Sequence, residues 1–192
     1  MKSGTRALGI AESYREDRSH LAGVVVTPDR TVDDVSLSSC TVGGTDSTDG
    51  VVDCYRRLGR DDIRYVLVSG IALAWYNVLD LSTAAEATDR PVLSVTFEAS
   101  EGLERSLREH FTGDDLDERL AIYEALSPRD RIDVNGHDVY VRSAGLPEGT
   151  GPSAADIVRT FTPEGGRPEP VRVARLVARA VADDRTPDPE RS

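Results

Sequence analysis

Ile63-Arg64-Tyr65-Val66-Leu67-Val68-Ser69-Gly70 is the segment that indicates most directly which fold class this chain adopts. Apolar residues follow one another here almost without a break, whereas a strand with one solvent-facing side alternates apolar and polar residues. Such a strand is buried on both faces, which is typical of a parallel strand in a sheet covered by helices. The sequence predicts a second strand of this kind at Val92–Phe97, after a helix from about Val78 to Ala87.

Three further strands are predicted before this stretch, at Arg6–Ile10, Leu21–Thr27 and Thr31–Val42. A charged stretch from Tyr14 to His20 separates the first two, and Pro28-Asp29 supplies a turn before the third. Because the three strands follow one another through short connections, they favour an antiparallel meander.

The pair Gly43-Gly44 marks a change from strand periodicity to helix periodicity. Thr48 or Asp49 is the expected N-cap of the following helix, and Gly59 is expected to end it. The apolar side of this helix consists of Val51, Val52, Tyr55 and Leu58. The spacing therefore predicts a helix between the third strand and the buried fourth one.

The rest of the chain predicts a hairpin and more helices. Asn135-Gly136 is typical of a type I′ turn and predicts a β-hairpin over Asp133–Tyr140. Helices are expected around Glu101–His110, Asp114–Leu126, Ser153–Phe161 and Glu169–Ala182. The order of elements predicts an α/β fold with a ribonuclease H-like mixed sheet, three antiparallel strands and then parallel strands, flanked by helices. Residues 1–182 are expected to form a single domain, and the acidic tail 183–192 to be disordered.

The charged residues indicate the solvent in which the protein works. The chain of 192 residues has 34 acidic and 23 basic side chains, a net charge of −11, and its basic residues are 22 Arg and one Lys, against 21 Asp. This composition favours a halophilic protein, although an Arg-rich proteome is an alternative origin. At about 1 M salt the screening length falls to about 3 Å, so the negative charge does not exclude a nucleic-acid partner. Binding through a diffuse basic surface is excluded.

Cysteines, histidines and apolar runs give further expectations. Cys40 and Cys54 lack metal-like spacing and are expected to be buried, unbridged packing groups in a cytoplasmic protein. His20, His110 and His137 are expected in a charged loop, at a helix end and in a hairpin turn, all poor places for catalysis. Polar residues interrupt the apolar run from 63 to 81, so no membrane span is predicted.

Acidic residues that follow the predicted strands are the candidate metal ligands. Glu12 follows the first strand, Asp46 and Asp49 follow the third, and Ser69 follows the fourth. Two or three carboxylates that converge there would hold Mg²⁺ for phosphodiester cleavage. The alternative is that Asp46 or Asp49 only caps a helix.

Two other features are candidates for binding a phosphate. The loop Gly43-Gly44-Thr45 lies before a helix N-terminus, where free backbone N–H groups bind anions, although a tight strand-to-helix turn explains it equally well. Arg172, Arg175 and Arg179 form a basic stripe on the last predicted helix, for which a solvated helix face is the alternative.

The sequence resembles an uncharacterised archaeal family. The stretches that carry the resemblance are Ala7-Leu8-Gly9-Ile10-Ala11-Glu12-Ser13, Thr41–Asp49, Val66–Asp80 and Arg167-Pro168-Glu169-Pro170-Val171-Arg172-Val173-Ala174. The family is the endonuclease V-like family, number ninety-nine in the domain-of-unknown-function series, and the resemblance extends from Arg6 to Val181. It implies a ribonuclease H-like fold. It also implies a relationship to endonuclease V, a Mg²⁺-dependent nuclease that recognises inosine in nucleic acid.

The resemblance also implies where metal ligands belong, and this chain departs from the pattern. Relatives have Gly-x-Asp-Asp where this chain has Gly9-Ile10-Ala11-Glu12, and Asp-Gly where it has Ser69-Gly70. The late His that assists the nuclease falls near Gly145, where this chain has none. Asp46 and Asp49 remain, and Glu12 is the acid closest to the missing one at Ala11.

Two functional classes follow. The first is a non-catalytic or weakly active module that binds RNA or DNA. The second is a divergent Mg²⁺-dependent endonuclease with Glu12, Asp46 and Asp49 as metal ligands, Asp46 and Glu12 also being catalytic. The residues expected to bind are Gly43, Gly44, Thr45, Asp49, Ser69, Gly70, Asn77 and Arg172. The missing acids at Ala11 and Ser69 favour the first class.

Overall fold

The structure, a computed structural model, describes residues 4–147 and 149–184. A seven-stranded sheet has the order β3-β2-β1-β4-β7-β9-β8. Its strands are β1 (Arg6–Arg15), β2 (Arg18–Val26), β3 (Val32–Thr41), β4 (Ile63–Ser69), β7 (Val92–Thr96), β8 (Asp130–Val134) and β9 (His137–Ala144). β1, β2 and β3 pair antiparallel, whereas β4 is parallel to both β1 and β7. The predicted mixed sheet is therefore confirmed.

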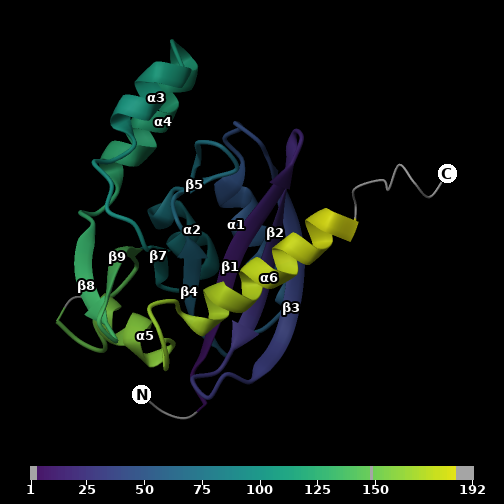
Figure 1. Ribbon diagram of the computed structural model, residues 1–192, viewed down its shortest axis with the longest axis vertical. Helices are drawn as coiled ribbons and strands as arrows, with labels where there is room; N and C mark the ends of the chain where they lie inside the picture. Colours follow the sequence, from purple (N-terminus) through teal and green to yellow (C-terminus); the bar gives the residue numbers. More distant parts are fainter. Residues whose placement is uncertain (1–3, 148, 185–192) are drawn as a thin grey trace.

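Helices cover both faces of this sheet (Figure 1). They are α1 (Ser47–Leu58), α2 (Leu81–Thr88), α3 (Glu104–His110), α4 (Asp114–Ala125), α5 (Ala154–Thr160) and α6 (Glu169–Asp184). α6 crosses one face over β1 and β2, and α1 and α2 lie on the opposite face. α3 and α4 project beyond one end of the sheet.

β4 lies at the centre of the core, as its sequence predicts. Val66, Leu67 and Val68 are fully buried. Leu67 packs in the apolar cluster that α5 and α6 cover, and its two neighbours pack in the cluster beneath α1 and α2. Burial of both faces explains why this strand shows no apolar–polar alternation.

The first hairpin is longer than predicted. β1 continues to Arg15 and β2 begins at Arg18, so most of the charged stretch is strand and His20 lies in β2 instead of a loop. Only a tight turn separates the strands, and Glu16 adopts a φ of +54° there. The prediction ended the strands too early because their charged ends lie in solvent. A strand in solvent needs no alternation of apolar and polar residues.

The starts of α1 and α2 also differ from the predictions. α1 begins at Ser47, with Asp46 in the N-cap position, so neither Thr48 nor Asp49 is the cap. α2 begins at Leu81, three residues later than predicted, because the Asp80 side chain accepts hydrogen bonds from Ser82 N and Thr83 N. A small hairpin of β5 (Ala72–Leu73) and β6 (Asn77–Val78) fills the interval.

The C-terminal elements follow the predictions closely. Asn135 and Gly136 both have positive φ in the β8–β9 turn, as a type I′ turn requires. α6 extends to Asp184, so Asp183 and Asp184, assigned to the disordered tail, are helical, and Asp183 pairs with Arg15. The remainder of the predicted tail, 185–192, lies outside the described residues.

The surface and the cysteines complete the description. No helix among the described residues is long and apolar enough to cross a membrane.

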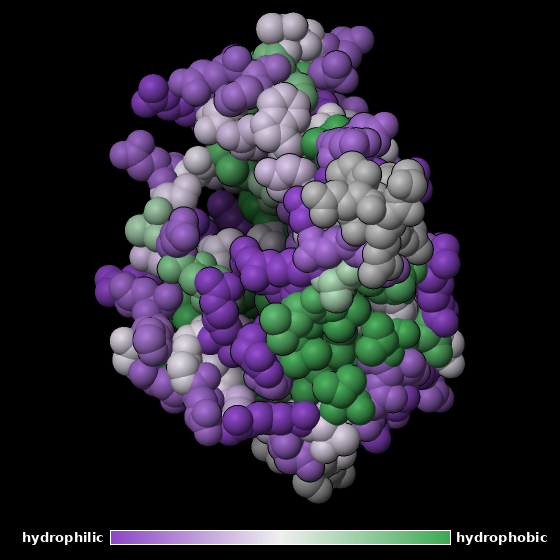
Figure 2. All heavy atoms as spheres, turned by 45° about the vertical axis from the view of Figure 1, so that its right-hand side comes forward, coloured by the Kyte–Doolittle hydropathy of each residue, from purple (hydrophilic) through white to green (hydrophobic). Residues whose placement is uncertain are grey.

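Both Cys40 and Cys54 are buried free thiols, as predicted, and burial raises the pKa of each to about 12. Figure 2 shows an apolar area among charged side chains on one face of the molecule. Val35 of β3 and Leu176 of α6 are among the exposed large apolar side chains.

Candidate functional site

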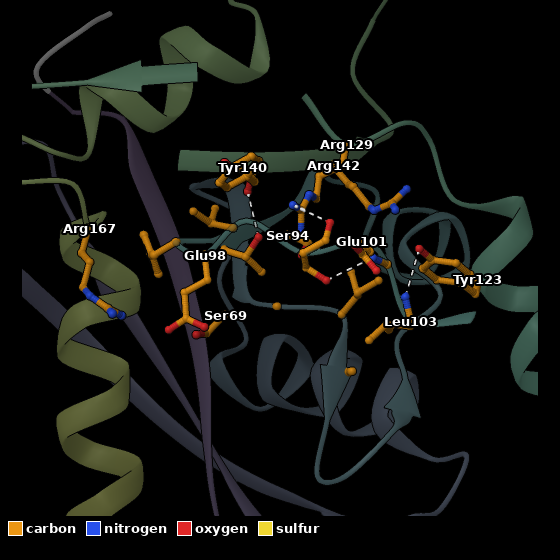
Figure 3. Close-up of a pocket in the computed structure, with 18 of the residues that line it drawn as sticks. Ser69, Ser94, Glu98, Glu101, Leu103, Tyr123, Arg129, Tyr140, Arg142 and Arg167 are labelled. Atoms are coloured by element: carbon orange, nitrogen blue, oxygen red, sulfur yellow. Dashed lines mark hydrogen bonds between the residues drawn. The ribbon is translucent and has the colours of Figure 1, made fainter. Parts of the chain in front are cut away.

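A pocket of about 620 Å³ opens where the parallel strands β4 and β7 end (Figure 3). Ser69 ends β4 and Thr96 ends β7, Gly70 and Phe97 are the residues that follow them, and all four line the pocket. The carboxyl ends of adjacent parallel strands are where α/β sheets commonly bind ligands. This cavity, called the β4–β7 pocket below, contains two of the predicted binding residues, Ser69 and Gly70.

Gly9 determines how close α6 comes to the sheet. A Cβ atom at Gly9 would lie 2.1 Å from the carbonyl carbon of Pro170 in the first turn of α6. No larger residue fits there, so the helix backbone rests directly on β1. This contact places the start of α6, with Arg167 just before it and Arg175 two turns along, beside the β4–β7 pocket.

Four arginines line the pocket, and none of them forms an ion pair within the described chain. They are Arg129, Arg142, Arg167 and Arg175. Figure 3 shows Arg167 on one side of the pocket and Arg129 and Arg142 on the opposite side, with Ser69 and Glu98 between them. Most other described arginines pair with a carboxylate, so this pocket is unusual in bringing four arginines without an ion pair together.

Aromatic rings support three of these guanidinium groups. Arg167 lies 4.1 Å from the centroid of the Phe97 ring, and Arg129 lies 4.3 Å from that of Tyr140. Arg142 lies 5.4 Å from the centroid of Tyr123. Cation–π contacts hold a guanidinium group in place without neutralising its charge. The arginines therefore remain available to an anion.

The pocket is positively charged although the chain is acidic. Four arginines and two glutamates, Glu98 and Glu101, leave it with a net charge of about +2 at neutral pH. Partial loss of solvent lowers the pKa of Arg167 most, the charges of Arg175 and Arg179 lower it further, and Glu98 opposes them. The cationic side chains are thus close enough to repel one another.

The rim of the pocket is held by hydrogen bonds from the loop before α3. Leu103 N donates to the Tyr123 hydroxyl over 3.3 Å, which ties this loop to α4. Arg129 donates to the Ser100 carbonyl, also over 3.3 Å. These contacts connect the α3–α4 pair to the wall of the pocket.

Asp46 and Asn77 form a separate cluster at the β3–α1 turn. Both carboxylate oxygens of Asp46 accept hydrogen bonds from Thr41, and Oδ1 also accepts one from Asn77 Nδ2 over 2.7 Å. Asn77 is fully buried, and its other contacts are Ser47 N at 2.8 Å and the Thr41 carbonyl at 2.9 Å. Burial opposes ionisation of Asp46, but these hydrogen bonds outweigh it and lower its pKa.

The backbone N–H groups of both glycines in the glycine loop donate hydrogen bonds within the protein. Gly43 N donates to the Ala74 carbonyl and Gly44 N to the Thr41 carbonyl. The buried Arg119 side chain binds the carbonyl oxygens of both glycines. This geometry favours the tight strand-to-helix turn over the anion-binding role.

The remaining predicted residues lie apart from the pocket lining. Glu12 accepts a hydrogen bond from Ser19 on the β1–β2 hairpin, and Asp49 is exposed in the first turn of α1. Arg172 donates two hydrogen bonds to Glu169, at 2.7 and 2.6 Å, and this contact raises its pKa. Thr45 is exposed in the glycine loop.

These placements do not provide a ligand set for Mg²⁺. Within residues 4–147 and 149–184, no group of three or more His, Cys, Asp or Glu side chains lies close enough together to hold a metal ion. Ala11 is buried in an apolar cluster with Val24, Val26 and Ala174. Ser69 offers only a neutral hydroxyl, and both oxygens of Asp46 already accept hydrogen bonds. The described residues therefore do not fit the metal that the resemblance implies.

Sequence reasoning missed most of the pocket. Phe97, Tyr140 and three of the four arginines were not among the predicted site residues, and Arg175 appeared only in the basic stripe on the last helix. They come from separate elements, so no local motif contains them. The usable signals were the position of Phe97 at the end of a buried strand and that of Arg175 on an amphipathic helix.

Comparisons with known proteins identify the family. The family model described as endonuclease dU matches residues 3–182. A UPF0215 protein of Pyrobaculum calidifontis is 34% identical over 180 residues, which cover 92% of this chain and 96% of that protein. The chain belongs to the endonuclease dU family. The resemblance found in the sequence is thereby confirmed.

Solved structures confirm the fold of this endonuclease dU family member. A protein of unknown function from Archaeoglobus fulgidus superposes with a TM-score of 0.81 at 27% identity, covering 92% of this chain and 98% of that one. Endonuclease V of Ciona intestinalis, in complex with a 24mer DNA containing an inosine followed by a ribo-adenosine, has a TM-score of 0.59 at 12% identity. That match covers 94% of this chain and 87% of the enzyme. At this identity it shows the ribonuclease H-like fold alone.

Proposed function

We propose that this endonuclease dU family member binds nucleic acid, RNA or DNA, in the β4–β7 pocket with little or no nuclease activity. The observation that carries the proposal is the gathering of arginine and aromatic side chains in one pocket of a chain with a net charge of −11. Guanidinium groups form charge-assisted hydrogen bonds with phosphate oxygens, and aromatic rings stack on bases. A localised basic pocket of this kind can bind a phosphate at high salt, whereas binding through a diffuse basic surface is screened.

The lack of cleavage is proposed from the residues at the expected ligand positions. Ala11 is apolar and Ser69 is neutral, so two of the carboxylates that the resemblance implies are absent. Mg²⁺ binds proteins mainly through carboxylate oxygens and gives up its water reluctantly. A degenerate metal site of this composition would leave the nucleic acid bound and uncut.

The alternative is a divergent Mg²⁺-dependent endonuclease that acts on inosine-containing or dU-containing nucleic acid. The description of the matching family as endonuclease dU favours it. In this case Glu12, Asp46 and Asp49 would have to rearrange into one metal site. Asp46 would then have to release the hydrogen bonds that both its oxygens accept from Thr41.

One experiment separates the two functions. Fluorescein-labelled single- and double-stranded oligonucleotides, DNA and RNA, with or without one dU or inosine, are titrated with the protein in KCl from about 0.2 to about 2 M. Anisotropy measures binding, and a denaturing gel after incubation with Mg²⁺ or Mn²⁺ measures cleavage. We expect saturable binding that weakens with salt, and intact strands. Cleavage that Asp46→Ala abolishes establishes the alternative, and the absence of binding to every oligonucleotide refutes the proposal.

A matched pair of variants tests whether the pocket is the binding site. Arg129→Gln removes a cation from the pocket, whereas Arg131→Gln removes one that pairs with Asp138 outside it. Both changes alter the net charge equally. We expect the first variant to bind about tenfold more weakly and the second to bind within about twofold of the wild type.

We also propose that the protein is cytoplasmic and adapted to concentrated salt. The excess of Asp and the replacement of all but one Lys by Arg support a protein adapted to concentrated salt. Unfolding in urea at about 0.2 and about 2 M KCl tests this, because screening of the repulsion among acidic side chains would raise the unfolding free energy.

A further inference from the structure

The β4–β7 pocket holds guanidinium groups beside Ser69, one of the two positions at which the resemblance implies a metal ligand that this chain lacks. Ser69, at which the resemblance implies an Asp, lines the pocket together with Arg167 and Arg175. Ala11, the second position at which an implied carboxylate is missing, contacts the same helix, α6. Its methyl group packs in one apolar cluster with Ala174, and Arg175 is the next residue of α6.

The fold holds these two arginines in place. Gly9 lets the first turn of α6 rest on β1, which fixes the height of the helix above the strand ends. Arg167 precedes the helix and lies over the Phe97 ring at the end of β7. Arg175 follows two turns later, so both cations face one pocket from one side of the sheet.

The protein offsets the charge of these arginines only in part, through Glu98 beside Arg167. Among the described residues, Arg167 and Arg175 form no ion pair, whereas Arg172 on the same helix pairs with Glu169. The pKa of Arg167 falls through partial loss of solvent, and the neighbouring cations lower it further. Two unpaired cations held close to one another are unfavourable unless an anion binds between them.

We propose that Arg167 and Arg175 take the place of the metal ion in holding a phosphate group, so that phosphate binding in this pocket needs no Mg²⁺. The inference rests on the proposed function for the source of the phosphate, which is the backbone of a nucleic-acid strand. Each guanidinium carries a permanent charge and two parallel N–H donors that match phosphate oxygens. Unlike Mg²⁺, it does not lower the pKa of a bound water, so it binds the strand without generating a nucleophile.

Two probes test the proposal on the full-length protein. The first is a fluorescein-labelled single-stranded DNA containing one dU, titrated by anisotropy in EDTA and in MgCl₂ at matched ionic strength. The second is inorganic pyrophosphate, added in EDTA while the melting temperature is followed. The variants are Arg167→Gln and Arg175→Gln, and Arg172→Gln is the matched control because it removes a cation from the same helix. Circular dichroism verifies that each variant is folded.

We expect the wild-type Kd for the oligonucleotide to agree within about twofold between EDTA and Mg²⁺. Arg167→Gln and Arg175→Gln should each weaken binding about tenfold and reduce the salt dependence, and both should lose the stabilisation by pyrophosphate. Arg172→Gln should behave as the wild type. Binding that EDTA abolishes, or equal Kd values for all three variants, overturns the proposal. If pyrophosphate stabilises the protein but no oligonucleotide binds, the proposed function is refuted. The phosphate site at Arg167 and Arg175 is then still supported.

Discussion

The side-chain amide of Asn77 donates a hydrogen bond of 2.7 Å to Oδ1 of Asp46. Through its other contacts, Asn77 joins the end of β3 to the first turn of α1. Both residues come from stretches that carry the family resemblance. Their geometry assigns them to holding the β3–α1 turn.

Asn77→Ala should destabilise the protein by about 3 kcal/mol, because it leaves the buried Ser47 N–H without its acceptor and removes two partly buried hydrogen bonds. Urea unfolding measures the change. Asp49→Ala removes an exposed side chain from the first turn of α1 and should cost less than about 1 kcal/mol. Equal stability of Asn77→Ala and the wild type would contradict the structural role.

The lowered pKa of Asp46 predicts a loss of stability in acid. A carboxylate whose pKa is lower in the folded state stabilises the protein above its unfolded pKa, and the contribution disappears as the pH falls through the folded pKa. Between about pH 5 and about pH 3, the unfolding free energy of the wild type should therefore fall more steeply than that of Asp46→Asn. The contributions of all other carboxylates cancel when the wild type and Asp46→Asn are compared. Parallel pH curves would show that Asp46 contributes nothing.

The fold could be predicted from the sequence because local periodicity reports burial. The uninterrupted apolar residues of β4 and β7 required a sheet covered on both faces, and Asn135-Gly136 set the last hairpin. Periodicity failed where burial did not decide the conformation. The charged end of the first hairpin and the short β5–β6 hairpin are the two examples.

The candidate site could be predicted only in part, because it depends on contacts between distant segments. Ser69 and Gly70 were found because they follow a buried strand. The arginines around them are brought together by α6 and β9, and no spacing in the sequence reports this. Asp46 was selected as a metal ligand from its position after a strand, but its hydrogen bonds to Thr41 become visible only when β3 and the turn are folded.

A side chain at Gly43 should destabilise the protein while Trp75 is present. Its φ is +68°, and a Cβ atom would lie 2.8 Å from Cε3 of the Trp75 ring. Gly43→Ala should therefore cost about 2 kcal/mol, partly from backbone strain and partly from the clash. In a double-mutant cycle by urea unfolding, Gly43→Ala with Trp75→Ala should cost about 1 kcal/mol less than the sum of the single changes. Additive costs would mean that the ring moves aside freely.

Mg²⁺ should leave the thermal stability of the wild-type protein unchanged. An ion that binds only the folded state adds about 2.7 kcal/mol at a hundred times its Kd, which would raise the melting temperature by several degrees. Because Ala11 and Ser69 provide no carboxylate and Asp46 is held by Thr41, we expect a shift below about 1 °C when MgCl₂ replaces KCl at equal ionic strength. Calcium chloride serves as the control for general divalent effects. A rise of several degrees that Asp46→Ala removes would place a metal ion at the β3–α1 turn and would favour the nuclease.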